Sequence, residues 1–363
     1  MGNDSKRNLA VGHFFADPFI PTVEPYFERI REVYYSWPGL LTSRRSPVAP
    51  HQQQQQLARD LRRCRENGVV LDLLLNALCY GDNSCSRELE NTVRDALKNF
   101  KDGGLLPEVV TTTSPFIAMV VKKYFPQTDV RASVVSRLNS TLAMEYASEY
   151  FDSFYMRRDW QRDLPTVRMY SEWAAKNGKE VCMLVNSNCL HDCPWQPFHA
   201  TLLSHGFSKA CRDCNNAGFD LALCTRMYSS GRYVEFLRTT WIRPEDLHLF
   251  EPYIKCFKLS TRDVAYPAKI VKAYAERRWD GDLLELIDPG FQYKPKVRFD
   301  NTAFPADWAA SGIAAKCASN CTHCGRCEQV LSMVARPVES TDDDSDTAEA
   351  AEPALSISVP GGF

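Results

Sequence analysis

The sequence predicts an α/β protein whose main part is a (β/α)8 barrel of the TIM type. Two observations lead to this fold. Strand-like and helix-like segments alternate eight times over roughly the first 280 of the 363 residues, and a barrel of this kind takes about 250 residues. The strand-like segments are short runs of β-branched, aromatic and aliphatic residues, whereas the helix-like segments repeat apolar residues at helical spacing. A doubly wound open sheet is the main alternative, and the count of eight units favours closure into a barrel.

Each strand–helix unit can be placed along the chain. The predicted strands cover residues 8–14, 32–37, 69–76, 108–113, 129–136, 152–157, 180–185 and 253–259. The predicted helices cover residues 22–31, 51–67, 86–100, 115–124, 140–149, 164–177, 194–205 and 267–277. Ser86 is followed within four residues by Glu88 and Glu90, which predicts a capped start for the third helix.

Three segments do not fit the repeating pattern. Within the barrel domain, residues 1–287, the stretch 207–246 separates the seventh and eighth units and is too long for a simple loop, so it is an insertion. Residues 288–337 form a cysteine-rich C-terminal extension. Residues 338–363 carry seven acidic residues and no lysine or arginine, which predicts a disordered acidic tail.

The composition narrows the class of protein. Hydrophobic residues make up 44% and charged residues 24% of the chain, which is ordinary for a globular protein and excludes a mostly disordered one. No apolar run approaches the ~18 residues that span a bilayer, and the first residues lack the apolar core of a signal peptide. We therefore expect a cytoplasmic protein without a membrane partner. The net charge is -2, and without the tail 43 basic residues face 38 acidic ones, a mildly basic body that permits an anionic substrate.

The fourteen cysteines are unusual, because a chain of this length does not need disulfides to hold a core. The first group is Cys189 and Cys193, spaced C-x3-C, with Cys211 and Cys214, spaced C-x2-C. It follows the seventh strand, so it would lie over the barrel mouth. Four thiolates suit either Zn²⁺ or a [4Fe-4S] cluster, and spacing alone does not separate the two. Small core residues that bind nothing remain the alternative.

The second group lies in the extension and comprises Cys317, Cys321, Cys324 and Cys327. Its density predicts a further metal site. The first three of these residues also have the C-x3-C-x2-C spacing of the cluster ligands in radical-SAM enzymes. Those enzymes place that motif after the first barrel strand, so here the spacing indicates an auxiliary site or a coincidence.

Polar residues at the ends of the predicted strands mark a substrate site, because chemistry in such barrels lies where strands lead into loops. The residues that we predict to bind substrate are Arg157, Arg158, Asp159, Asn186 and Arg262. The set suits a polar or anionic ligand. It contains one carboxylate, so it offers no pair of acids for glycosidase-type chemistry.

Several short motifs in order suggest a family. They are DSFYMRRDWQRDL, VCMLVNSNCLHDCPWQPFH, CRDC, IKCFKLSTR and AYAERRWDGDLLELIDP. With the barrel, they resemble the peptidase U32 family and its relatives over residues 8–289. The resemblance implies a (β/α)8-type barrel and an oxygen-sensitive [4Fe-4S] cluster. It also implies oxygen-independent hydroxylation, which relatives carry out on ubiquinone precursors and on tRNA or rRNA bases, although early members were labelled peptidases.

The resemblance can be carried over at three cysteines and fails at two points. Cys189, Cys211 and Cys214 match the cluster cysteines of the family. The family commonly spaces the last pair C-x3-C, and its fourth ligand comes from an early loop, near residues 43–45 here, where no cysteine stands. Cys193 would then take the fourth place, or the metal differs.

Three functions follow from these observations. The first is an iron–sulfur enzyme with one or two [4Fe-4S] clusters that hydroxylates or otherwise oxidises or reduces a polar small molecule or RNA. Such an enzyme would use an electron donor protein and could pair with a second U32-type subunit. The second is a cysteine-type peptidase, with Cys189 and either His191 or His199 as the nucleophile and base. The third is a non-catalytic binding protein stabilised by Zn²⁺.

Overall fold

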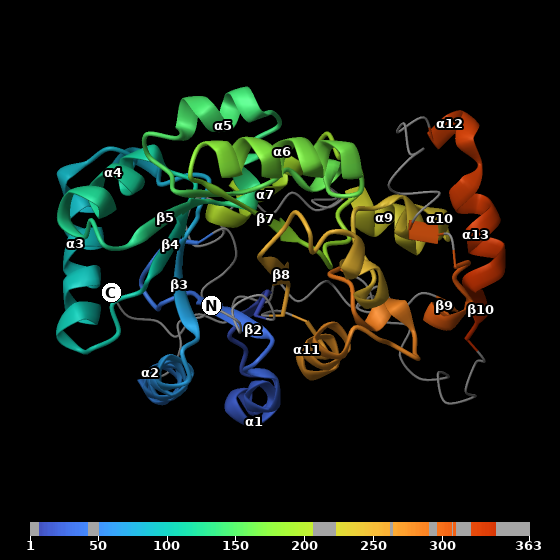
Figure 1. Ribbon diagram of the computed structural model, residues 1–363, viewed down its shortest axis with the longest axis horizontal. Coiled ribbons are helices and arrows are strands. Elements are labelled where there is room, and N and C mark those ends of the chain that lie inside the picture. The colour runs from blue at the N-terminus through green and yellow to red at the C-terminus, as the bar shows by residue number, and fades with distance from the viewer. Residues whose placement is uncertain are drawn as a thin grey trace.

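The computed structural model describes residues 7–42, 51–205, 223–261, 264–289, 296–306, 308–309 and 321–338, and within them the barrel is closed (Figure 1). Parallel strands follow one another around it in chain order, and β1 pairs with both β2 and β8. The predicted (β/α)8 fold is therefore confirmed. The strands are β1 Leu9–Gly12, β2 Ile30–Tyr35, β3 Val70–Leu75, β4 Val109–Thr112, β5 Asp129–Ala132, β6 Ser153–Tyr155, β7 Glu180–Leu184 and β8 Phe257–Leu259.

The helices of the barrel lie outside the strands (Figure 1). They are α1 Phe19–Val23, α2 His51–Glu66, α3 Arg87–Asp102, α4 Pro115–Tyr124, α5 Thr141–Ala147, α6 Leu164–Lys176, α7 Gln196–His205 and α11 Pro267–Glu276. The predicted cap of the third helix is present, because Ser86 Oγ accepts a hydrogen bond from the backbone N–H of Leu89 at 3.0 Å. None of the described helices combines the length and the apolar character needed to cross a bilayer.

The predicted helix over residues 22–31 is wrong in position. The chain instead forms the short α1, a 3-10 turn over Glu24–Tyr26, and then β2, which begins at Ile30. Pro25 lies in the turn and has no N–H for an α-helical hydrogen bond, so the helix stops before it.

The fifth and eighth strands are shorter than predicted. β5 ends at Ala132, and a 3-10 turn, Val134–Ser136, follows it. β8 begins at Phe257 rather than at residue 253, because the backbone N–H groups of Tyr253 and Ile254 both donate to the carbonyl of Phe250 in the preceding turn.

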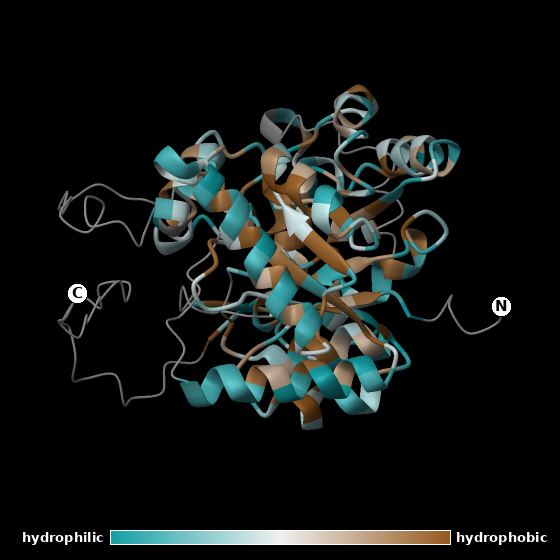
Figure 2. Cartoon of the chain, turned by 90° about the vertical axis from the view of Figure 1, so that its left-hand side faces the viewer, coloured by the Kyte–Doolittle hydropathy of each residue, from teal (hydrophilic) through white to brown (hydrophobic). Residues whose placement is uncertain are grey.

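The side chains form two distinct interiors. The larger is apolar and lies between the strands and the surrounding helices, with residues such as Leu9, Val11 and Leu61 fully buried. In Figure 2, hydrophobic colour is concentrated on the strands and hydrophilic colour on the outer helices.

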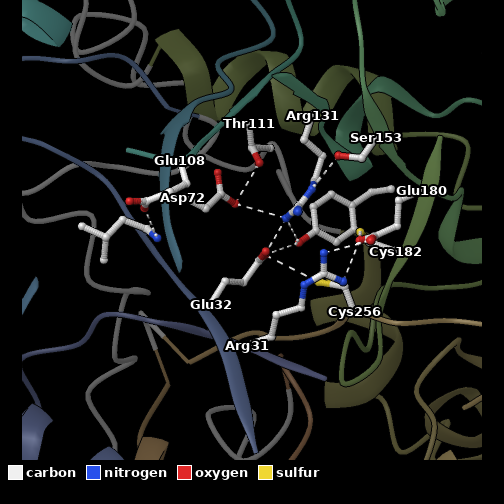
Figure 3. A network of polar contacts seen from close by, with 12 residues as sticks. Arg31, Glu32, Asp72, Glu108, Thr111, Arg131, Ser153, Glu180, Cys182 and Cys256 are labelled. Atoms are coloured by element: carbon white, nitrogen blue, oxygen red, sulfur yellow. Dashed lines mark hydrogen bonds and ion pairs between the residues drawn. The ribbon is translucent and has the colours of Figure 1, made fainter. Parts of the chain in front are cut away.

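The space enclosed by the strands holds buried ionic groups beside a small cluster that includes Tyr34, Leu74 and Tyr155, although such barrels usually fill it with branched apolar residues. Arg131 of β5 lies at its centre, with Nη1 at 2.5 Å from Glu32 Oε1 and 3.7 Å from Asp72 Oδ2 (Figure 3). The Thr111 hydroxyl donates to Asp72 Oδ2 at 2.8 Å. Lys258 of β8 supplies a second buried cation, with Nζ at 3.8 Å from the centre of the Tyr34 ring.

Burial affects the two interior carboxylic acids differently. It would raise the pKa of Glu32, but the attraction and hydrogen bond of Arg131 bring that pKa below its ordinary value. For Asp72, burial raises the pKa to about 6, because the more distant Arg131 offsets less of the cost and Glu32 repels the second negative charge.

The part of the insertion that is described, from residue 223 on, packs with the C-terminal extension beside the barrel (Figure 1). The insertion forms α9 Leu223–Ser229 and α10 Val234–Arg238, and the extension forms β9 Val297–Phe299, α12 Cys321–Cys324, α13 Arg326–Val334 and β10 Ala335–Pro337. β9 and β10 pair antiparallel. The acidic tail beyond residue 338 and residues 207–222 lie outside the described residues.

An arginine of the barrel joins these two segments. The Arg162 guanidinium lies 4.4 Å from the Trp241 ring and 5.7 Å from the Trp308 ring, and its Nε and Nη1 donate to the carbonyls of Trp241 and Leu237. The two indole rings stack at 6.2 Å. The extension thus shares one apolar core with the insertion and the barrel.

Candidate functional site

The carboxyl ends of β5, β6 and β7 form the part of the barrel mouth that carries the predicted site. After β6, the chain passes through Arg157 into a 3-10 turn, Arg158–Trp160. After β7, Asn188 N–H donates to the carbonyl of Asp288 at 2.7 Å, which fixes the loop that carries Cys189. Both loops therefore start from rigid strands.

Cys189 lies beside Arg158. The Arg158 Nη1 donates to Cys189 Sγ at 3.0 Å and to Ser187 Oγ at 3.2 Å. Cys189 is half-buried. The Arg158 N–H thus fixes the position of the sulfur, which is the atom that would bind a metal or attack as a nucleophile.

Cys193 follows in the same loop and is also half-buried. Burial raises the pKa of the Cys193 thiol, and the nearby Cys189 sulfur acts in the same direction. A negative charge on the Cys189 sulfur thus adds a repulsion that disfavours a second negative charge on Cys193. A bound cation would remove this repulsion, as it does in sites made of several thiolates.

Asp159 is buried at the edge of this site and is held as a carboxylate. Burial acts to raise its pKa, but the Asp192 N–H, which donates to Asp159 Oδ1 at 2.8 Å, and the Arg157 guanidinium bring the pKa below its ordinary value. Arg157 also reaches Asp192, with Nη2 at 2.8 Å from Oδ1. Asp159 thus anchors the loop after β7 to the loop after β6.

His191 completes this contact. Its Nε2 lies 3.2 Å from the Asp159 carbonyl oxygen, and its Nδ1 lies 3.0 Å from Asp192 Oδ2. Ligand atoms of Asp159, His191 and Asp192 lie within 4.8 Å of one another, which is close enough to surround a cation. Arg157 contacts both carboxylates, so its positive charge already occupies the position that a cation would take.

The structure brings together several of the residues predicted from the sequence. Arg157, Arg158 and Asp159 lie with Cys189 and Cys193 at the mouth. Asn186 is fully buried below them. Its Nδ2 donates to the carbonyls of Ser260 and Leu286, and its Oδ1 accepts from Ser260 N–H, so both donors of the amide serve the backbone and Asn186 positions the strand ends.

The remaining predicted residues are only partly described. Arg262, Cys211, Cys214 and Cys317 lie outside the described residues, and the Cys321 side chain is not described. Cys324 is exposed and Cys327 is half-buried, on either side of Gly325, which has a positive φ of 62°. Two cysteines of the second group therefore flank the turn between α12 and α13.

Sequence reasoning missed Arg137. This residue follows β5 and has a left-handed backbone with φ of 53°. Its Nη1 donates to Gln196 Oε1 at 2.5 Å, and its Nη2 lies 3.9 Å from Asp159 Oδ2. The predicted fifth strand runs to residue 136, whereas β5 ends at Ala132, so the true end of this strand and the arginine that follows it were not identified.

Comparisons with known proteins agree with this architecture. No protein-family model matches the chain. The chain is 22% identical over 303 residues to the uncharacterized protease MJ1657 of Methanocaldococcus jannaschii, and the match covers 82% of this chain and 87% of that protein. Among solved structures, the U32 peptidase Mk0906 is similar with a TM-score of 0.51 and 14% identity, over 71% of this chain and 94% of that one. The predicted resemblance to the peptidase U32 family is confirmed.

Proposed function

We propose that this chain is a U32-type iron–sulfur enzyme that carries out an oxygen-independent hydroxylation or another redox modification. Its substrate would be a polar small molecule or an RNA, and a donor protein would supply electrons, with a second U32-type subunit as a further partner. We expect the protein to act in the reducing cytoplasm, which would keep Cys189 and Cys193 available as thiols.

The observation that supports this proposal is the pair of thiols at the barrel mouth. Cys189 and Cys193 supply soft sulfur ligands, which select zinc, copper(I) or iron–sulfur clusters over hard cations. The Arg158 N–H on Cys189 Sγ fits a cluster, because hydrogen bonds to the ligand sulfurs tune its reduction potential. With Cys211 and Cys214, the two would hold a cluster that supplies one-electron transfer when bound.

The residues around the thiols have separate tasks in this proposal. Arg158 holds the Cys189 sulfur in place, and Asp159 fixes Arg157 at the mouth, where its guanidinium would orient a polar substrate. We propose a second metal group at Cys317, Cys321, Cys324 and Cys327. It would relay electrons as a cluster, or stabilise the extension as Zn²⁺.

The deciding measurement is iron, zinc and acid-labile sulfide per chain in protein purified without oxygen. About four or eight irons with equal sulfide would support one or two clusters. Zinc without sulfide would overturn the cluster proposal and leave the zinc-stabilised binding protein.

A set of variants assigns the metal to its site. Cys189→Ser should remove about four irons, whereas Cys85→Ser, which changes an exposed cysteine in the loop after β3 that belongs to neither cysteine group, should remove none. Equal metal content in both variants would contradict the assignment of the first group.

A cysteine peptidase is the alternative, and the name of the archaeal relative favours it. The geometry of His191 argues against it, because its two ring nitrogens face Asp159 O and Asp192 Oδ2 rather than a thiol. Hydrolysis of a peptide library that persists in the presence of a chelator, and that Cys189→Ser abolishes, would favour the peptidase.

A further inference from the structure

Three arginines gather at the barrel mouth, one from the loop after β5 and two from the loop after β6. Arg137 follows β5, Arg157 follows β6, and Arg158 begins the next turn. All three are partly exposed, so their guanidinium groups are accessible from solvent. Only Asp159 and Asp192 face them as carboxylates among the described contacts.

The geometry points to a binding site for a phosphate monoester formed by Arg137, Arg157 and Arg158 in front of Cys189. This inference rests on the proposed function, because it names the anionic group by which the substrate would be held. Guanidinium groups are suited to phosphate, since each presents a planar fork of N–H donors. Three forks together offer more donors than a planar carboxylate can accept, whereas a tetrahedral dianion presents three charged oxygens to them.

The Arg137 guanidinium can donate further hydrogen bonds to a ligand. Its hydrogen bond is to the neutral Gln196 side chain, and the nearest carboxylate oxygen, Asp159 Oδ2, lies beyond hydrogen-bond distance at 3.9 Å. Burial lowers its pKa, and the positive charges of Arg157 and Arg158 lower it further. A bound dianion would relieve this repulsion.

A bound phosphate could replace Asp192 as the ion-pair partner of Arg157. The Asp192 side chain is 56% exposed, and it shields Arg157 through one contact at 2.8 Å. An incoming phosphate would take over the Arg157 Nη2 donor from this carboxylate. Asp159, by contrast, is buried and accepts from the Asp192 backbone, so it would stay in place.

The backbone of the site is strained. Arg137 and Asp192 have φ of 53° and 50°, and Arg277 is the other non-glycine residue with positive φ in the described ranges. Such conformations persist where the surrounding structure enforces them, and they concentrate at binding and catalytic sites. Here the two strained residues, Arg137 and Asp192, both lie next to the Asp159 carboxylate.

The test is calorimetric titration of the full chain, purified without oxygen, with inorganic phosphate and, separately, with succinate. Wild-type protein should bind phosphate saturably and more tightly than succinate. Arg137→Gln should weaken binding about tenfold or more, since it removes charge-assisted hydrogen bonds. Arg168→Gln, which removes an exposed arginine of α6, is the matched control and should change nothing.

Asp192→Asn gives the sharper result, because it should tighten phosphate binding by about two- to fivefold, the size expected for losing an exposed competing charge. Asparagine accepts a left-handed backbone, so the loop should keep its shape. An arginine cluster with only a structural role would not respond in opposite directions to these two changes.

Several outcomes would overturn the inference. They are no saturable phosphate binding in the wild type, equal affinity in Arg137→Gln and wild type, tighter binding of succinate than of phosphate, or weaker phosphate binding in Asp192→Asn. Iron and sulfide are measured on the same samples. Phosphate binding by protein that holds no cluster would refute the proposed redox function and leave the phosphate site standing. A cluster in protein that does not bind phosphate would refute the phosphate site and leave the redox function standing.

Discussion

Replacing the buried Asp72 with asparagine should stabilise the protein more at alkaline than at acidic pH, relative to the wild type. The structure raises the pKa of Asp72 to about 6 from an ordinary value of 3.8. The folded state therefore holds the proton more tightly than the unfolded chain does. The stabilisation that comes from protonated Asp72 is complete below pH 3.8 and is lost as the pH rises through 6.

The size of the effect follows from this shift. A difference of roughly two pKa units corresponds to about 3 kcal/mol, and about half of it falls between pH 5 and pH 8. Asparagine cannot ionise and can still accept the hydrogen bond of Thr111. The free energy of unfolding of Asp72→Asn, minus that of the wild type, should thus rise by about 1–1.5 kcal/mol from pH 5 to pH 8.

Urea unfolding at intervals across this range, followed by circular dichroism, measures the difference. Glu32→Gln is the matched control in the same interior. The Arg131 ion pair lowers the pKa of Glu32, so its stabilising contribution is present at neutral pH and is lost as the pH falls through its folded pKa. Because that loss occurs below pH 4.5, the difference between Glu32→Gln and the wild type should stay nearly flat from pH 5 to pH 8, whereas the difference for Asp72→Asn should rise. A flat difference for Asp72→Asn, or a fall toward pH 8, would refute the reasoning.

Three further predictions concern the packing of the barrel. Arg131→Met should lower the free energy of unfolding by about 3–5 kcal/mol, because it leaves buried carboxylates without their nearest cation. Adding Glu32→Gln to this variant should recover part of the lost stability. Urea unfolding of both variants measures the two changes. Trp308→Ala should lower the free energy of unfolding by about 3–5 kcal/mol, because the Trp308 ring fills the space beside Trp241. Limited proteolysis of this variant should cut the extension before it cuts the barrel. Gly12→Ala should lower the melting temperature, because a Cβ there would lie 2.5 Å from Cζ of the Tyr34 ring; no change in calorimetry would contradict this.

The order of strands and helices was predictable from the sequence because each unit repeats its own apolar period. The helix α4, Pro115–Tyr124, begins and ends as predicted, since a proline starts it and a serine caps it. The predicted helix over residues 22–31 is wrong because Pro25 ends the helical segment and the apolar residues that follow belong to β2.

The site was predictable where strand ends were located correctly. Arg157, Arg158 and Cys189 were found because β6 and β7 end within a residue or two of their predicted limits. The polar interior was not found, because Asp72 stands alone in an apolar strand and its partner Arg131 lies in β5. Only closure of the barrel brings them together, and no local pattern records that.

The buried acidic and basic side chains of the barrel interior come from different halves of the chain, which affects how the barrel closes. Glu32 and Asp72 belong to β2 and β3, whereas Arg131 and Lys258 belong to β5 and β8. A half-barrel made of the first four strands would enclose acidic groups alone, and one made of the last four would enclose basic groups alone. Neither half can neutralise its own centre, so a fragment that stopped at either would gain little by closing on itself. Only the complete ring places Arg131 against both Glu32 and Asp72, so the attraction between opposite charges favours the joining of the two halves.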